Sequence, residues 1–246
     1  MVIDGHVHVG QSLYGLGVTP EQLLQVMDEV GINKSVIVPV KPRDYDLSKA
    51  NSYVAQAVRD YPDKFIGVAR IDPWLGNDAI EELERACLYQ KLKGIALHPW
   101  EENFQINNPI VFPIMDFAER NKLPVVIEGG YPHVSHPLQI ADLARRYPKV
   151  TVVMTNGGEL DLSGFTRGDA HTAMKLCPNL IMGTSGLCSH ERLVDTVNQL
   201  GPNRVIFESH LPMMEPSLEI LRITRASISE EAKEAALSGN ALRIYS

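Results

Sequence analysis

SVIVPV at residues 35–40 and PVVIEG at residues 124–129 are the segments that decide the fold. Both are short and almost continuously apolar, which is typical of parallel strands buried on both faces. Similar runs recur at intervals of roughly thirty residues, and each is followed by a helical pattern, so the chain is predicted to alternate parallel strands with crossover helices. We count eight strands, at residues 1–8, 34–40, 65–71, 93–98, 123–128, 150–156, 179–183 and 204–210.

The stretch TPEQLLQVMDEVG at residues 19–31 shows how the helices are delimited. Thr19 can cap the helix, Pro20 suits its first turn, and Gly31 suits its end. Eight strand–helix units in 246 residues match the size of one closed (β/α)8 barrel. We therefore predict a single domain over residues 1–246, an α/β TIM barrel with an extra C-terminal helix. A doubly wound open sheet is the structural alternative.

The composition favours a small-molecule partner. The formal net charge is -7, and acidic and basic residues are mixed along the chain, which argues against binding to nucleic acid or to an acidic membrane. A signal-peptide pattern and a run of about 18 apolar residues are both missing from the sequence, so we expect a cytoplasmic protein. Cys87, Cys177 and Cys188 are widely spaced, and we expect them to be reduced thiols.

His6 and His8 lie at the end of the first predicted strand. Because they are two residues apart, their side chains leave the same face of the strand, which is the barrel interior. Barrel enzymes build their active sites at this end of the strands, and imidazole binds divalent transition metals. The pair therefore predicts half of a metal site, with two hydrogen-bonded pocket histidines as the alternative.

Further motifs extend over nearly the whole chain. They are IDGHVHVG (3–10), DKFIGVARIDP (63–73), LKGIALHP (92–99), LPVVIEGG (123–130), YPKVTVVMTNGG (147–158), PNLIMGTSG (178–186), RVIFESHLP (204–212) and ISEEAKEAALSGNALRIY (228–245). Together they resemble the amidohydrolase-related (amidohydrolase 2) family, which includes aminocarboxymuconate-semialdehyde decarboxylase and barrel lactonases. The resemblance implies a metal-dependent enzyme on a TIM barrel.

The sequence departs from the pattern of that family at three places. The family carries histidine after the fifth and sixth strands and aspartate after the eighth, whereas this chain has Glu128, Asn156 and His210 there. Two of the exchanges compensate, because three imidazoles and one carboxylate are retained. The resemblance therefore implies a permuted site in which His6, His8, Glu128 and His210 bind one divalent ion, zinc in the first place and manganese or iron as alternatives. A degenerate site without metal is the other reading.

Two further carboxylates are candidate catalytic groups. Glu208 lies two residues before His210, so it could orient that histidine, accept a proton, or serve as a structural acceptor in the barrel. Glu159 follows a pair of glycines and could reach the pocket as a general base, or stay a solvated loop residue.

Three residues are candidate substrate contacts. Arg70 ends the third strand and could bind a substrate carboxylate, or form a salt bridge with a neighbouring acid. His98 ends the fourth strand above small residues and could be a substrate contact or an extra ligand. The resemblance implies the contact, because similar LHP sequences occur in the family without ligation. Asn156 could hold a water or a substrate carbonyl through its amide.

The leading interpretation is a metal-dependent hydrolase of a small carboxylate-bearing ester, lactone or amide. The metal would polarise the carbonyl and lower the pKa of a bound water. The family resemblance also permits non-oxidative decarboxylation, and a non-catalytic barrel with a degenerate site is a third alternative. We expect a small-molecule substrate and neither nucleic acid nor membrane as a partner, with homo-oligomers an open alternative.

Overall fold

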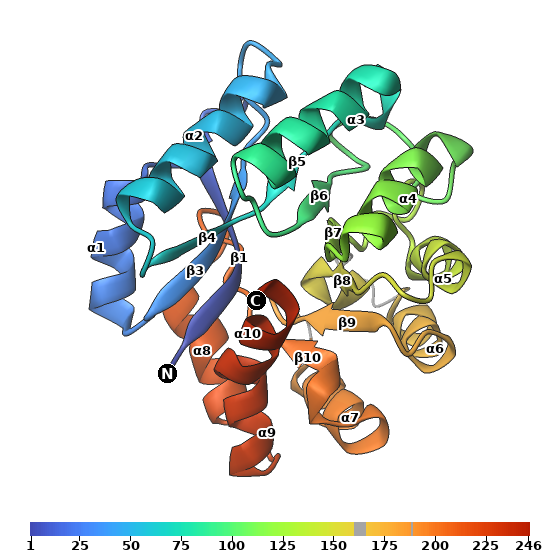
Figure 1. Cartoon of the computed structure of the whole chain (residues 1–246). Helices are drawn as coiled ribbons and strands as arrows, with labels where there is room; N and C mark the ends of the chain where they lie inside the picture. Colours follow the sequence, from blue (N-terminus) through green and yellow to red (C-terminus); the bar gives the residue numbers. More distant parts are fainter. Residues whose placement is uncertain (160–165, 188) are drawn as a thin grey trace.

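Parallel strands surround the centre of the molecule, and helices lie outside them (Figure 1). The computed structural model describes residues 1–159, 166–187 and 189–246. Cys188 is outside these residues, while Cys87 and Cys177 are buried free thiols, as expected. In the described part of the chain, the helices are too short or too polar to cross a membrane.

The strands form two hydrogen-bonded sheets, in the orders β2-β1-β3-β4 and β10-β9-β8-β7-β6-β5. Their bounds are β1 Ile3–Gln11, β2 Gly17–Val18, β3 Lys34–Pro39, β4 Phe65–Gly67, β5 Ala69–Arg70, β6 Ile95–Leu97, β7 Val125–Ile127, β8 Val152–Met154, β9 Leu180–Gly183 and β10 Val205–Ile206. The pairings are parallel apart from the antiparallel pair of β1 and β2. β4 and β5 are two parts of one predicted strand, which changes its pairing partner from β3 to β6 at Val68.

Backbone hydrogen bonds also join β1 to the segment that follows β10. Gly5 N donates to Phe207 O at 2.7 Å, and His210 N donates to His6 O at 3.0 Å. A Cβ at position 5 would lie 2.6 Å from Ile206 Cδ1 and 2.8 Å from Phe207 O, so this close approach requires glycine. The contacts place His6 and His210 side by side, although they are far apart in the sequence.

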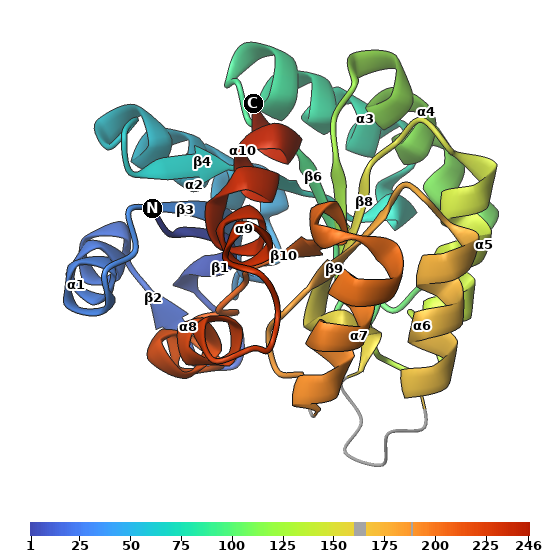
Figure 2. The same cartoon turned by 90° about the horizontal axis from the view of Figure 1, so that it is seen from below.

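A separate apolar cluster fills the space that the strands enclose, and α10 (Asn240–Tyr245) adds the side chains that cover it from the end where the strands begin. Figures 1 and 2 show α10 over this end of the ring. The buried members are Ile3, Val36, Val38, Val68, Ala96, Val126, Val153, Ile181, Ile206, Ala241, Ile244 and Tyr245. This interior core and the strand order are those of a TIM barrel, and α10 is the predicted extra helix.

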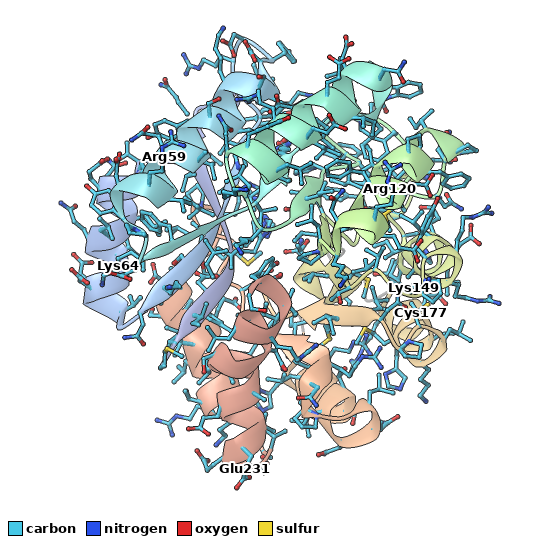
Figure 3. All side chains as sticks on the ribbon, in the orientation of Figure 1. Arg59, Lys64, Arg120, Lys149, Cys177 and Glu231 are labelled. Carbon is cyan, nitrogen blue, oxygen red and sulfur yellow. The ribbon has the colours of Figure 1, made fainter. Side chains whose placement is uncertain are left out.

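The helices pack around the strands as amphipathic elements. The α-helices are α1 Pro20–Val30, α2 Leu47–Asp60, α3 Asn77–Leu83, α4 Phe112–Asn121, α5 Pro137–Arg146, α6 Arg167–Leu176, α7 His190–Leu200, α8 Pro216–Thr224, α9 Glu230–Glu234 and α10. Short 3-10 turns are η1 Pro73–Leu75, η3 Pro109–Val111, η4 Thr155–Gly158 and η5 Pro202–Arg204, and π-helical turns are η2 Glu84–Tyr89 and η6 Ala235–Gly239. Thr19 caps α1, and Gly31 ends it at a φ of 80°, as predicted. Charged side chains such as Lys149 and Glu231 project outward (Figure 3).

Candidate metal centre

Four buried side chains from β1 and from the segments after β7 and β10 converge. β1 carries His6 and His8, Glu128 directly follows β7, and His210 follows β10. One ligand atom from each of the four residues lies within 4.8 Å of the others. The structure thus brings together the four residues that the sequence analysis selected as metal ligands, and they can hold one metal ion.

The separations between the donor atoms suit a single divalent cation. His6 Nε2 is 2.6 Å and His8 Nε2 is 3.2 Å from Glu128 Oε1, and the two nitrogens are 3.0 Å apart. His210 Nε2 is 3.8 Å from Glu128 Oε2. Neighbouring ligands of a tetrahedral ion, each about 2.0 to 2.1 Å from the metal, would be about 3.3 Å apart. The donor set therefore fits such an ion with small adjustments.

The protonation states also suit metal binding. Burial lowers the pKa of His8, and it lowers the pKa of His210 to about 3, so both imidazoles are neutral near pH 7. Burial works against ionisation of Glu128, but the neighbouring His6 and the hydrogen bonds with His6 and His8 hold the pKa of this carboxyl well below its usual value. Neutral imidazole and ionised carboxylate are the forms that bind metal. His6 differs: burial lowers its pKa, but Glu128 outweighs this and raises it. A cation would replace the proton on His6.

A chain of hydrogen bonds holds Glu128 from behind. Thr155 Oγ1 donates to Glu128 Oε2 at 2.9 Å, and Asn156 Nδ2 donates to Thr155 Oγ1 at 3.0 Å. Ser185 Oγ in turn donates to Asn156 Oδ1 at 3.1 Å. Partners of this kind orient metal ligands and tune their affinity. Sequence analysis missed Thr155 and Ser185. The available signal was their position just after β8 and β9, which are the next two strands of the sheet after β7.

Asn156 takes part in this chain. Its side chain is fully buried, and it is not among the described residues that line the cavity beside the cluster. Its φ of 54° is in the left-handed region, which asparagine tolerates better than most residues. The structure therefore places the amide in the chain of hydrogen bonds behind Glu128, and the substrate contact of Asn156 stays a prediction.

A cavity of about 260 Å³ borders the cluster through His8 and His210. Arg70, His98 and an aromatic pair form other parts of its wall. The rings of Trp100 and Tyr131 stack, with centroids 5.4 Å apart and planes 7° from parallel. The cavity is small for a ligand site, and its wall combines flat aromatic surface with hydrogen-bond donors.

Arg70 and His98 reach the cavity wall, but other residues already bind them. The guanidinium of Arg70 contacts Glu101 and also Glu102, whose Oε1 is 2.7 Å away, so the salt-bridge alternative for Arg70 is the one observed. His98 Nδ1 accepts a hydrogen bond from the backbone N–H of Glu101 at 3.3 Å. Burial and the charge of Arg70 hold the pKa of His98 well below its usual value, so His98 is neutral.

The two carboxylates predicted as catalytic groups are not on the cavity wall, although the charge of Glu208 helps to raise the pKa of the metal-cluster residue His6. Glu208 is fully buried, and burial raises its pKa to about 8. Its carboxylate occupies the space above Gly183, where a Cβ would lie 1.8 Å from Glu208 Oε2. Glu159 is also buried, and its Oε1 is 2.9 Å from Nε of Arg192 in α7. Neither glutamate is among the described residues that line the cavity, so the structure does not support the proposed base roles.

Comparison with known proteins gives a family and a fold. A family model described as amidohydrolase matches residues 3–246. The 2-amino-3-carboxymuconate-6-semialdehyde decarboxylase of Dictyostelium discoideum is 32% identical over 101 residues, which are 38% of this chain and only 28% of that protein.

Solved structures of decarboxylases share the fold over almost their whole length. The 5-carboxyvanillate decarboxylase of Sphingomonas paucimobilis is 19% identical with a TM-score of 0.79, over 99% of this chain and 98% of that one. A dihydroxybenzoic acid decarboxylase from Polaromonas sp. JS666, solved with bound manganese, is 16% identical with a TM-score of 0.77, over 99% and 96%. At these identities the likeness establishes the fold alone.

Proposed function

The chain belongs to the amidohydrolase family, whose model it matches over residues 3–246, and on this basis we propose that it is a metal-dependent decarboxylase of a small carboxylic acid. The observation that carries the proposal is the convergence of three imidazoles and one carboxylate beside a cavity of about 260 Å³, whose wall includes His8 and His210. The relatives described above are named as decarboxylases. They favour decarboxylation over the hydrolysis that the residues alone suggested.

The positions of the acids also favour decarboxylation. Hydrolysis needs a base beside the attacking water, and neither Glu208 nor Glu159 is among the described residues of the cavity wall. Decarboxylation needs no attacking water. The carboxylate leaves as CO2, the electron pair stays on carbon, and a proton then replaces the lost group.

A bound divalent cation would supply the positive charge that holds the acid and stabilises the electrons left behind. The residues of the chain supply the geometry. His8 and His210 present neutral rings at the cavity, and the stack of Trp100 on Tyr131 offers a flat surface suited to a planar, conjugated acid. We propose zinc or manganese as the ion, because three imidazoles with one carboxylate suit zinc and the Polaromonas relative holds manganese.

Metal analysis and an assay on a panel of acids test this proposal. We expect about one metal ion per chain and metal-dependent CO2 release from at least one small aromatic acid. Glu128→Gln and His210→Ala should lose metal and activity together while circular dichroism stays unchanged. His190→Ala is the matched control, because His190 is an exposed histidine on α7. Metal-dependent cleavage of lactones or esters without CO2 release would contradict the decarboxylase proposal and support the hydrolase interpretation.

A further inference from the structure

Two consecutive glutamates contact one buried guanidinium at the cavity wall. The side chain of Arg70 is 1% exposed, and its Nη2 contacts both Glu101 Oε2 and Glu102 Oε1. Glu102 points into the protein, where it also lies 3.7 Å from Lys41 Nζ. Glu101 differs because its side chain is 15% exposed and lines the cavity. One glutamate is therefore a buried partner of Arg70, and the other shares the space that a ligand would enter.

The atom Glu101 Oε2 lies between two hydrogen-bond donors. One is Arg70 Nη2, and the other is His98 Nε2 at 3.8 Å. The backbone N–H of Glu101 donates to His98 Nδ1, and a neutral imidazole that accepts at Nδ1 carries its proton on Nε2. Both groups that face Glu101 Oε2 thus offer a proton. The atom marks a position for an acceptor oxygen.

The side chain of Glu101 can leave this position without movement of its backbone. The N–H of Glu101 is bound by His98, its carbonyl oxygen accepts from Lys41 Nζ, and Glu102 N donates to the carbonyl of His98 at 3.1 Å. The main chain is held at three points, whereas the contacts of the carboxylate with described residues are those with Arg70 Nη2 and, at 3.8 Å, with His98 Nε2. Rotation about the side-chain bonds of Glu101 is sufficient to open the position.

The net charge around Arg70 becomes more positive by one unit when the carboxylate of Glu101 rotates away. With Glu101 in place, the two cations Arg70 and Lys41 are balanced by Glu101 and Glu102. With Glu101 rotated away, one positive charge is left beside the cavity, and a ligand carboxylate would restore the balance. An uncharged ligand group would leave the buried Arg70 undercompensated.

We propose that Arg70 and His98 form a second anion subsite in the cavity, that Glu101 occupies it in the free protein, and that a second acidic group of the substrate displaces Glu101. This inference rests on the proposed function in one respect, namely that the substrate is a carboxylic acid held at the metal cluster. It narrows the substrate class to small acids with two anionic groups. Glu101 then competes with the ligand and disfavours monocarboxylates. Displacement of Glu101 costs free energy, and a monocarboxylate has no second charge to replace that of Glu101.

Binding of benzoate and of isophthalate to the metal-loaded full chain tests the subsite. The chain has two tryptophans: Trp100 lines the cavity, and the indole of Trp74 donates to the carbonyl oxygen of Glu102 at 3.0 Å. Intrinsic fluorescence therefore reports on this loop. We expect Glu101→Gln, which removes the competing charge, to lower the Kd of isophthalate by tenfold or more and that of benzoate by less than threefold.

Glu102→Gln is the matched control. It removes the same charge from the same guanidinium but leaves Glu101 in the subsite, so the isophthalate Kd should change by less than threefold. His98→Gln in the Glu101→Gln background should reverse part of the gain, and thermal melting shows whether each variant is folded. Equal gains for both acids in Glu101→Gln, or an equal gain in Glu102→Gln, would overturn the subsite.

The test separates this proposal from the decarboxylase proposal. If Glu101→Gln selectively strengthens isophthalate binding in a protein that releases no CO2 from any acid, the subsite stands and the decarboxylase falls. If the wild-type protein releases CO2 but Glu101→Gln shows no selective gain, only the subsite falls. Absence of isophthalate binding by both the wild type and Glu101→Gln overturns the subsite as well.

Discussion

Thr155 orients the carboxylate of Glu128 through a hydrogen bond. Its hydroxyl donates to Glu128 Oε2 and accepts from Asn156 Nδ2 and from Gly129 N, so its hydrogen-bonding capacity is fully used. A buried carboxylate that loses such a donor can rotate away from the metal.

We expect Thr155→Val to lower metal affinity by about 10- to 100-fold, because the isosteric side chain removes the hydrogen bond and keeps the packing. Competition with a chelator of known affinity measures this directly. Thr196→Val is the control, since Thr196 is equally buried but its hydroxyl contacts Met182 Sδ. Equal metal affinities of the wild type and Thr155→Val would show that Thr155 does not contribute to metal binding.

Glu208 makes the stability of the metal-free protein depend on pH. Burial raises its pKa from 4.5 to about 8, so the folded chain keeps a proton that the unfolded chain releases over this range. Because the pKa of Glu208 is higher in the folded chain, the stabilising contribution of its bound proton is fully present below about pH 4.5. This contribution is lost as the pH rises towards 8. The expected loss is about 1.4 kcal/mol per pH unit.

Urea unfolding of the chelator-treated protein at several pH values between 5 and 8 measures this slope. Glu208→Gln should remove it, while the contributions of Glu128 and of the histidines remain common to both proteins. Parallel stability curves for the wild type and the variant would show that Glu208 is ionised in the folded protein.

The site residues differ in how well the sequence predicts them. His6, His8, Glu128 and His210 could be found because each lies at the end of a predicted strand, and these predicted ends follow from the apolar runs. In the structure His6 and His8 lie within β1, Glu128 directly follows β7, and His210 lies beyond the end of β10. The partners of Arg70 and Glu159 could not be predicted. Glu101 lies in the loop after β6, and Arg192 lies in α7. These ion pairs therefore depend on tertiary packing, which no local sequence pattern predicts.

At the scale of elements, the order of strands and helices was predictable, but several strand ends were not. The predicted strand at 65–71 breaks at Val68, because its first half pairs with β3 and its second half with β6. The predicted strand at 204–210 pairs only as Val205–Ile206, since Glu208 N bonds to the Thr184 side chain and His210 has a φ of 58°. Local propensity does not encode such changes of partner.

Helix α10 stabilises the interior of the barrel through Ala241, Ile244 and Tyr245. We expect Ile244→Ala to reduce the free energy of unfolding by about 2 to 5 kcal/mol, because it leaves a cavity where the strands begin. Leu242→Ala on the same helix is the control, since Leu242 is 43% exposed, and it should cost less than about 1 kcal/mol. Urea unfolding compares the two, and similar losses would mean that α10 is held by helix propensity instead of by the interior core.

At the scale of the whole molecule, the metal cluster ties together distant parts of the chain. Its ligands come from β1, from the end of β7 and from the segment after β10, and the last of these also bonds to the backbone of β1. An unfolded chain cannot present these donors together, so bound metal stabilises only the folded state.

We therefore expect chelation to lower the melting temperature. A free metal concentration a thousand times the Kd contributes about 4 kcal/mol, which corresponds to roughly 8 to 16 °C for a domain of this size. Calorimetry with and without chelator measures the shift. Glu128→Gln should show almost none, and an equal shift in that variant would place the bound metal elsewhere.

The hydrogen bond between His210 N and His6 O also has a consequence for biosynthesis. At typical rates of translation, roughly 10 to 40 s separate the synthesis of the two histidines. During this time the first strand of the nascent chain lacks one of its two neighbours, the segment after β10, and the ligand set is incomplete. An ion held by all four ligands would therefore bind only after nearly all of the barrel has been translated.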